Sequence, residues 1–199
     1  MTDSHAPQGA DTGLLHLVAT GDESAFEELV EKYRHSVINT IHRYVGEYDA
    51  ADDIAQEVFV IVWTKAGTFK GKSSFSTWLY RIVVNECLQF RRTRKRKPPP
   101  VSLDSMDADS PPESLQTGDG HEQAARTAAV RQAIAELPDR QRIAIVLSHY
   151  EGLTYVEVAA ALETSVPAVE SLLIRARSAL RDKLVEHRQR PQVSPVAGI

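Results

Sequence analysis

The chain has 199 residues, a hydrophobic content of 42% and a formal net charge of −4, which suit one large or two small packed domains. No apolar run approaches the ~18 residues of a membrane span, and the N-terminus lacks a signal-peptide core, so we expect a cytoplasmic protein without direct membrane insertion. The single cysteine, Cys87, excludes an intrachain disulfide and a cysteine cluster for zinc.

Hydrophobic periodicity predicts four helices in the first half of the chain. Residues 1–11 are small and polar, and we expect them to be disordered. Helices are then predicted over about 12–20, 22–46, 50–65 and 76–97, with a loop over 67–74. Asp22 or Ser24 can cap the second helix, and Pro98-Pro99-Pro100 stops the fourth. Together, residues 12–97 form the first predicted domain.

Charge changes sign sharply where the fourth helix ends. Residues 91–97 hold six bases in seven positions, whereas residues 98–122 hold six acids and no Lys or Arg. The second segment also has the Pro, Ser, Asp and Gly content of a flexible linker. Because local charge governs encounter with phosphates, the acidic total conceals a basic patch suited to nucleic acid.

The second predicted domain spans residues 123–187, with helices over about 124–136, 139–150, 154–161 and 166–187. The tail 188–199 is expected to be loose. No strand pattern occurs, so we predict an all-α fold: two small helical domains joined by a flexible acidic linker.

The last two of these helices have the pattern of a helix-turn-helix. Thr154 and Glu157 can form a capping box, Ser165 can cap the next helix, and Pro167 lies in its first turn. An apolar stripe follows at helical spacing, and three arginines lie off it: Arg175, Arg177 and Arg181. The motif indicates DNA binding, although an ordinary amphipathic helix pair with solvated arginines shows the same pattern.

Carboxylates are plentiful, but they do not form a recognisable catalytic or metal site. Asp52, Asp53 and Glu57 lie close together on one helix, without a second pair of ligands. Glu31 and His35 are one residue too far apart for the Glu-x-x-His motif of helical metal proteins. No phosphate-binding loop or nucleophile elbow is present. We therefore expect no enzyme, no cofactor and no metal, and interpret the acidic cluster as a solvated helix start or a docking face.

Aromatic and basic residues interleave just before and along the fourth helix. Such a mixture suits unstacked nucleotides, because every base offers a π-face and every phosphate attracts a cation. We expect Phe75 and Trp78 to lie mostly in the core and Lys70 and Lys72 to face phosphate. The amide of Asn85 can bond a base edge. The candidate nucleic-acid residues of this segment are Phe69, Lys70, Lys72, Phe75, Trp78, Arg81, Asn85, Arg91 and Arg92.

Four segments, in this order, resemble bacterial extracytoplasmic-function (ECF) sigma factors, the small two-domain sigma subunits of RNA polymerase (sigma-70 family, group IV). They are 52–59 (DDIAQEVF), 69–85 (FKGKSSFSTWLYRIVVN), 137–142 (LPDRQR) and 150–155 (YEGLTY). The resemblance covers about residues 12–187. It implies that residues 12–97 are sigma region 2 and residues 123–187 sigma region 4.

The resemblance also implies partners. Core RNA polymerase is expected to bind through its clamp coiled coil to the helix carrying Asp52, Asp53, Gln56, Glu57 and Phe59, and through its flap to the helix-turn-helix flank. The acidic linker is expected to run toward the RNA path. A separate anti-sigma factor, often membrane-anchored, usually holds such proteins.

Promoter DNA is the other implied partner. The loop from Phe69 to Phe75, with Asn85, is expected to capture a flipped base of the −10 element. The helix-turn-helix is expected to read the −35 element. Two positions depart from the family: Glu170 replaces a common base and could accept from cytosine N4, and Leu172 replaces a frequent arginine. The −35 candidates are Thr154, Tyr155, Ser165, Pro167, Ala168, Glu170, Ser171, Ile174, Arg175, Arg177 and Arg181.

The alternative function is a stand-alone helix-turn-helix transcription regulator that binds duplex DNA without polymerase. The aromatic and basic segment over 68–85 speaks against it, because a reader of duplex DNA has no use for a base-capture loop.

Overall fold

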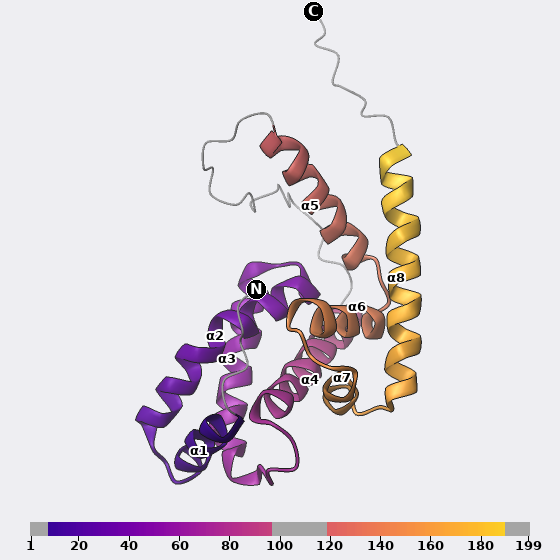
Figure 1. Cartoon of the computed structure of the whole chain (residues 1–199). Helices are drawn as coiled ribbons and strands as arrows, with labels where there is room; N and C mark the ends of the chain where they lie inside the picture. Colours follow the sequence, from indigo (N-terminus) through magenta and orange to yellow (C-terminus); the bar gives the residue numbers. More distant parts are fainter. Residues whose placement is uncertain (1–7, 97–118, 190–199) are drawn as a thin grey trace, which may run out of the picture.

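A computed structural model describes residues 8–96 and 119–189, and every regular element in these two ranges is helical (Figure 1). The predictions for residues 1–7, for most of the linker and for the end of the tail fall outside the described residues. The elements are α1 (Gln8–Ala19), α2 (Glu23–Val45), α3 (Tyr48–Lys65), a short 3-10 turn (Ala66–Thr68), α4 (Phe75–Arg96), α5 (Asp119–Ala135), α6 (Asp139–Ile145), a π turn (Val146–Tyr150), α7 (Tyr155–Ala161) and α8 (Val166–Gln189).

The first helix begins earlier than the sequence predicts. Residues 8–11 are helical rather than disordered, because Asp11 is buried and paired. The Tyr33 hydroxyl donates to the Asp11 carboxylate at 2.7 Å, and the Lys32 ammonium pairs with it too. Leu15 and Val18 then bury against the rest of the bundle. A partly buried ion pair with hydrogen bonds thus connects α1 to α2.

Helix α2 contacts each of the other three helices of the first bundle. Asp22 caps α2 by accepting from the Ala25 N–H at 3.0 Å. Gly46 ends α2 in the left-handed conformation, at φ 91°, which only glycine adopts without strain. Cys87 of α4 is fully buried, and burial raises the pKa of its thiol.

The helix predicted over 139–150 is divided in two. α6 ends at Ile145, and five residues follow in a π turn, which contains one extra residue per turn. The Glu151 N–H donates to the Val146 carbonyl and the Leu153 N–H to that of Leu147. Val146 and Leu147 stay buried in this wider turn, so tertiary packing overrides the regular helix.

The helix-turn-helix forms as its caps predict. Thr154 and Glu157 make the reciprocal capping box on α7. Glu163 adopts φ 49°, which turns the chain sharply between α7 and α8. The Ala168 N–H then donates to the Ser165 hydroxyl at 3.4 Å. The predicted stripe of α8 faces inward: Val169, Leu173 and Ala176 are buried and Leu172 and Leu180 are partly buried.

The two bundles pack directly on each other. α4 contacts α7, while α2 contacts α5 and the π turn. In Figure 1, α6 and α7 lie beside α4, and α8 forms the outer edge of the molecule. The sequence predicts the two domains, but it gives no indication of whether they contact each other.

Candidate functional site

A groove of about 880 Å³ lies between α2 and α3. Its apolar part contains the rings of Phe26 and Trp63, which meet edge to face with centroids 5.1 Å apart. Val60 lies in the same groove with 55% of its surface exposed. Acidic side chains from both helices accompany this apolar strip, so the groove suits an amphipathic partner with basic groups. The lining residues are Glu23, Phe26, Glu27, Val30, Arg34, Ile38, Asp52, Ala55, Gln56, Phe59, Val60 and Trp63.

Only part of the acidic cluster predicted on α3 lines this groove. Asp52 and Gln56 are exposed and line it, whereas Asp53 and Glu57 are exposed but do not line it. Phe59 is 9% exposed, so it forms part of the core beneath the groove rather than a projecting contact.

The apolar part of this groove is not predicted from the sequence. Val60 lies off the inward stripe of Ile54, Val58 and Val62 on an otherwise polar face of α3, and that position could have revealed it. Phe26 and Trp63 were not recognisable, because their proximity depends on how α2 and α3 pack.

The loop before α4 is built on buried aromatic rings. Phe69, Phe75 and Trp78 are each less than 10% exposed. The Trp78 ring meets those of Phe69 and Phe75 at 5.6 and 6.1 Å between centroids. The core placement predicted for Phe75 and Trp78 is confirmed and extends to Phe69. Because all three rings are buried, none presents an open stacking face to a nucleotide.

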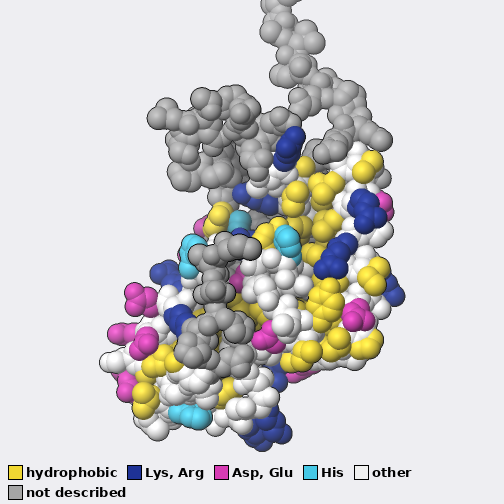
Figure 2. Space-filling view, viewed as in Figure 1, with side chains coloured by type: hydrophobic (Ala, Val, Ile, Leu, Met, Phe, Trp, Pro, Cys, Tyr) yellow, Lys and Arg dark blue, Asp and Glu magenta, His cyan; other side chains and the backbone are white. Residues whose placement is uncertain are grey.

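What this loop exposes is polar. Lys70 and Lys72 are exposed, and Gly71 between them adopts φ 64°. Asn85 is exposed on α4 one turn beyond the half-buried Arg81. The exposed side chains of this segment thus include cations and an amide. Figure 2 shows Lys and Arg side chains gathered at the bottom of the molecule, over the loop that precedes α4.

The outer face of α8 carries the side chains predicted for DNA. Glu170, Ser171, Ile174 and Arg175 are exposed, with Ile174 at 66%. Arg177 donates to the Tyr155 hydroxyl of α7 at 3.3 Å. Thr154, Ser165, Pro167 and Arg181 are exposed too, while Tyr155 and Ala168 are half-buried. Lys and Arg side chains lie along α8 in Figure 2.

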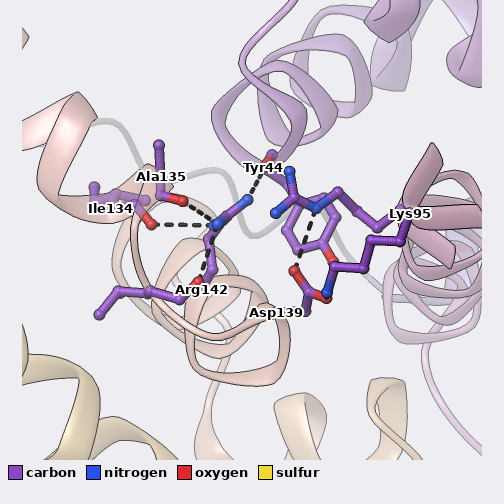
Figure 3. A network of polar contacts seen from close by, with 8 residues as sticks. Tyr44, Lys95, Ile134, Ala135, Asp139 and Arg142 are labelled. Carbon is purple, nitrogen blue, oxygen red and sulfur yellow. Dashed lines mark hydrogen bonds and ion pairs between the residues drawn. The ribbon is translucent and has the colours of Figure 1, made fainter. Parts of the chain in front are cut away.

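Arg142 is the most buried cation at the junction of the two bundles, with 2% exposure (Figure 3). Its guanidinium donates to the carbonyls of Ile134 and Leu137 at 3.1 and 3.0 Å, and to that of Ala135. A further bond, of 3.0 Å, reaches the Tyr44 carbonyl of α2. Both α2 and α5 therefore direct their C-terminal carbonyls at one cation, as the helix dipole favours.

Two carboxylates of the second bundle contact polar groups of the first. Glu151 accepts from the Tyr80 hydroxyl at 2.7 Å and from the Ser36 hydroxyl at 2.5 Å. Burial and the Glu151 charge raise the pKa of Tyr80. Asp139 accepts from Arg91 at 3.3 Å and from Lys95 at 2.7 Å. The predicted phosphate contact Arg91 is thus paired within the protein, whereas Arg92 is exposed.

Opposing effects act on the Asp139 carboxyl. Partial burial raises its pKa, but the Lys95 hydrogen bond and the charges of Arg91, Lys95 and Arg142 outweigh burial, and the pKa lies below its ordinary value. Asp139 is therefore an anion at neutral pH and holds its two cations by charge as well as by hydrogen bonds.

Neither a membrane helix nor a metal cluster occurs in the parts of the chain that the structure describes. Within residues 8–96 and 119–189, no helix is long and apolar enough to cross a bilayer. Across the same ranges, no three His, Cys, Asp or Glu side chains group so as to hold a metal ion.

Comparisons with known proteins match both bundles. Residues 29–97 match the model of sigma-70 region 2, and residues 127–180 match that of sigma-70 region 4. The chain is 36% identical to the RNA polymerase sigma-H factor of Pseudomonas aeruginosa over 190 residues, which cover 90% of this chain and 95% of that one. It is 35% identical to the ECF RNA polymerase sigma-E factor of Escherichia coli K12 over 188 residues, 89% of this chain and 95% of the relative.

Solved structures agree on the fold. CnrH, in complex with the cytosolic domain of CnrY, matches with a TM-score of 0.67 at 26% identity, over 89% of this chain and 98% of that one. The sigma factor RpoE of Bartonella quintana, in complex with the anti-sigma factor NepR, matches with a TM-score of 0.63 at 24% identity, over 80% and 96%. With both regions matched in order and relatives above 30% identity along nearly the whole chain, the protein belongs to the ECF group of the sigma-70 family of RNA polymerase sigma factors.

Proposed function

We propose that this chain is a non-catalytic initiation subunit that binds core RNA polymerase, recognises the −10 and −35 promoter elements and promotes DNA-templated transcription. The observation that carries the proposal is the pairing of two surfaces in one chain. One is the groove between α2 and α3, and the other is the polar outer face of a capped helix-turn-helix. An acidic, partly apolar groove suits a protein partner, and the face of α8 suits DNA.

The groove is the proposed dock for the polymerase clamp. Gln56 and Asp52 supply hydrogen-bonding groups, and Val60 supplies an apolar contact that is exposed in the free chain. Asp53 and Glu57 extend the acidic surface beside the groove. A coiled coil with a basic stripe and an apolar edge would match both parts of this surface.

The loop before α4 is the proposed −10 site. Since its three aromatic rings are buried, capture of an extruded base falls to the exposed part of the loop, residues 70–73, and to the Asn85 amide. Lys70 and Lys72 suit the flanking phosphates. Arg81 and Arg92 extend this surface along α4.

The face of α8 is the proposed −35 site. Residues early in such a helix reach base edges, and later ones meet the backbone. Glu170 and Ser171 are therefore proposed to set sequence preference, while Arg175, Arg177 and Arg181 add affinity. An anti-sigma protein is the proposed inhibitory partner, since CnrH, at 26% identity, was solved with a separate protein domain bound.

The experiment is binding of fluorescent full-length chain to core RNA polymerase. Val60→Asp places a charge in the proposed interface, and we expect affinity to fall at least about tenfold, because burying an unpaired charge costs more than the lost valine contact. Val185→Asp is the matched control, because Val185 is also half-exposed, at 49%, and lies on α8. Gln56→Ala with Glu57→Ala should weaken binding as well.

A wild-type chain that does not bind core polymerase, yet binds duplex DNA tightly by itself, would favour the stand-alone regulator. Equal loss of affinity in Val60→Asp and Val185→Asp would remove the polymerase dock from the α2–α3 groove.

A further inference from the structure

Part of the basic run at the end of α4 is occupied by the protein itself. Arg91 and Lys95 are four residues apart and so share one face of the helix. Both donate to Asp139, the first residue of α6 in the other bundle, one to each carboxylate oxygen (Figure 3 shows Lys95 with Asp139). The Asp139 side chain is 22% exposed, so this pairing lies partly inside the domain junction.

The arrangement around Asp139 resembles a phosphate contact. An arginine and a lysine on one helical face, each donating to a separate oxygen of one anion, are the groups with which proteins hold a nucleic-acid backbone. Other cations of the same run are differently placed. Arg92 is exposed, and Arg94 pairs with Glu47, which belongs to the same bundle. Among the ion pairs that this run makes within the described residues, those with Asp139 are the ones that connect the two bundles.

Other polar contacts hold the same two bundles together. Glu151, with 8% of its side chain exposed, accepts from Tyr80 of α4 and Ser36 of α2. Its second oxygen lies 3.9 Å from the Arg43 guanidinium. Acidic groups of the second bundle therefore face basic or hydroxyl groups of the first at both places, and α7 also packs on α4.

We propose that Asp139 is an internal phosphate mimic that closes region 4 onto region 2, so that the free chain withholds part of its basic run from DNA until a competing partner opens it. This proposal rests on the proposed function in one respect: it assumes that the basic run that begins at Arg91 binds nucleic acid. Arg91 and Lys95 can pair either with Asp139 or with a DNA phosphate, but not with both at once. DNA that needs both cations must therefore bind the open form, and it draws the population toward that form. Conversely, each contact that favours closure lowers the apparent affinity for DNA.

The test uses the full chain without polymerase. Asp139→Asn keeps the size of the side chain and removes its charge. Two readouts follow: the radius of gyration from small-angle X-ray scattering, and affinity for a short DNA duplex of random sequence at low salt. We expect the radius to increase, and the affinity to rise by about fivefold or more, the change that corresponds to losing two partly exposed ion pairs.

Glu47→Gln is the matched control. It removes the same charge and frees Arg94 of the same basic run, but its ion pair lies within the first bundle. Its DNA affinity should rise only by the general effect of one lost negative charge, and its radius should stay that of the wild type. The excess of Asp139→Asn over Glu47→Gln measures opening.

A second variant is needed because the Glu151 contacts could keep the two bundles together after Asp139 has lost its charge. Asp139→Asn with Glu151→Ala removes both acidic contacts and should open the chain further, with a larger gain in affinity. The proposal is overturned if this double variant keeps the wild-type radius, or if its DNA affinity matches that of Glu47→Gln. Because polymerase is absent from every arm, failure here leaves the proposed polymerase dock standing, and failure of the dock leaves this result standing.

Discussion

Arg142 offers the sharpest test of how this fold is stabilised. Its guanidinium is almost wholly buried and donates to three buried carbonyls, of Tyr44, Ile134 and Leu137, at 3.0–3.1 Å, and to the carbonyl of Ala135. Arg142→Met retains an unbranched apolar stem but removes every donor. Each buried carbonyl left without a partner costs about 1–3 kcal/mol.

The magnitude depends on how many of these carbonyls lose their last partner. The Ile134 carbonyl also accepts from the Leu137 N–H at 3.1 Å, so the buried carbonyls left unpaired are those of Tyr44 and Leu137. The lower value applies to each, because removing the guanidinium also removes the cost of burying its charge. Two carbonyls at about 1 kcal/mol each give about 2 kcal/mol of lost unfolding free energy. For a bundle of this size, that loss lowers the midpoint temperature by about 8 °C or more.

The assay is urea unfolding followed by far-UV circular dichroism, with amide hydrogen exchange to locate the change. Exchange should accelerate most at the ends of α5 and α2, where the carbonyls lie. Arg140→Met is the control, since Arg140 is exposed and makes one hydrogen bond, to the Leu162 carbonyl at 3.0 Å; we expect it to cost less than about 1 kcal/mol. A loss in Arg142→Met no larger than in this control would refute the reasoning.

The remaining predictions concern acid and sequence preference. Asp139 has a folded pKa below the ordinary value of about 3.9, so its contribution to closure is fully present above that value and is lost as the pH falls through the lowered pKa. Scattering should show the wild type expanding below about pH 4, beyond any expansion of Asp139→Asn, and identical profiles would contradict this. Glu170→Lys should alter the upstream sequence selected from a random DNA library, whereas Arg181→Ala should weaken binding to all sequences alike and flatten the salt slope by about one unit. A rewritten motif in Arg181→Ala with an unchanged one in Glu170→Lys would reverse the proposed orientation of α8.

Local signals account for what the sequence could predict. The caps at Asp22, Thr154 and Ser165 act within three residues, and they lie where the sequence places them. The inward stripe of α8 follows from helical spacing alone, so the exposed face opposite it was predictable too. Its role in reading DNA stays a prediction.

Contacts between distant residues account for the differences. The early start of α1 depends on Asp11 meeting Lys32 and Tyr33, which are more than twenty residues away. The π turn and the burial of Phe69 depend on tertiary packing. The pairing of Asp139 with Arg91 spans 48 residues and joins two bundles that no local pattern brings together. The groove beside Val60 likewise depends on the packing of α2 against α3.

The fully buried sulfhydryl of Cys87 has a consequence for redox chemistry. A thiol reacts with peroxide or disulfides as its thiolate, and burial both raises the pKa of this group and shields it from reagents. As Cys87 is the sole cysteine in the sequence, oxidants have no accessible thiol on the folded chain to modify. The folded protein should therefore not react with thiol-directed reagents. A cysteine introduced on its surface would then be labelled by a maleimide probe at that position alone.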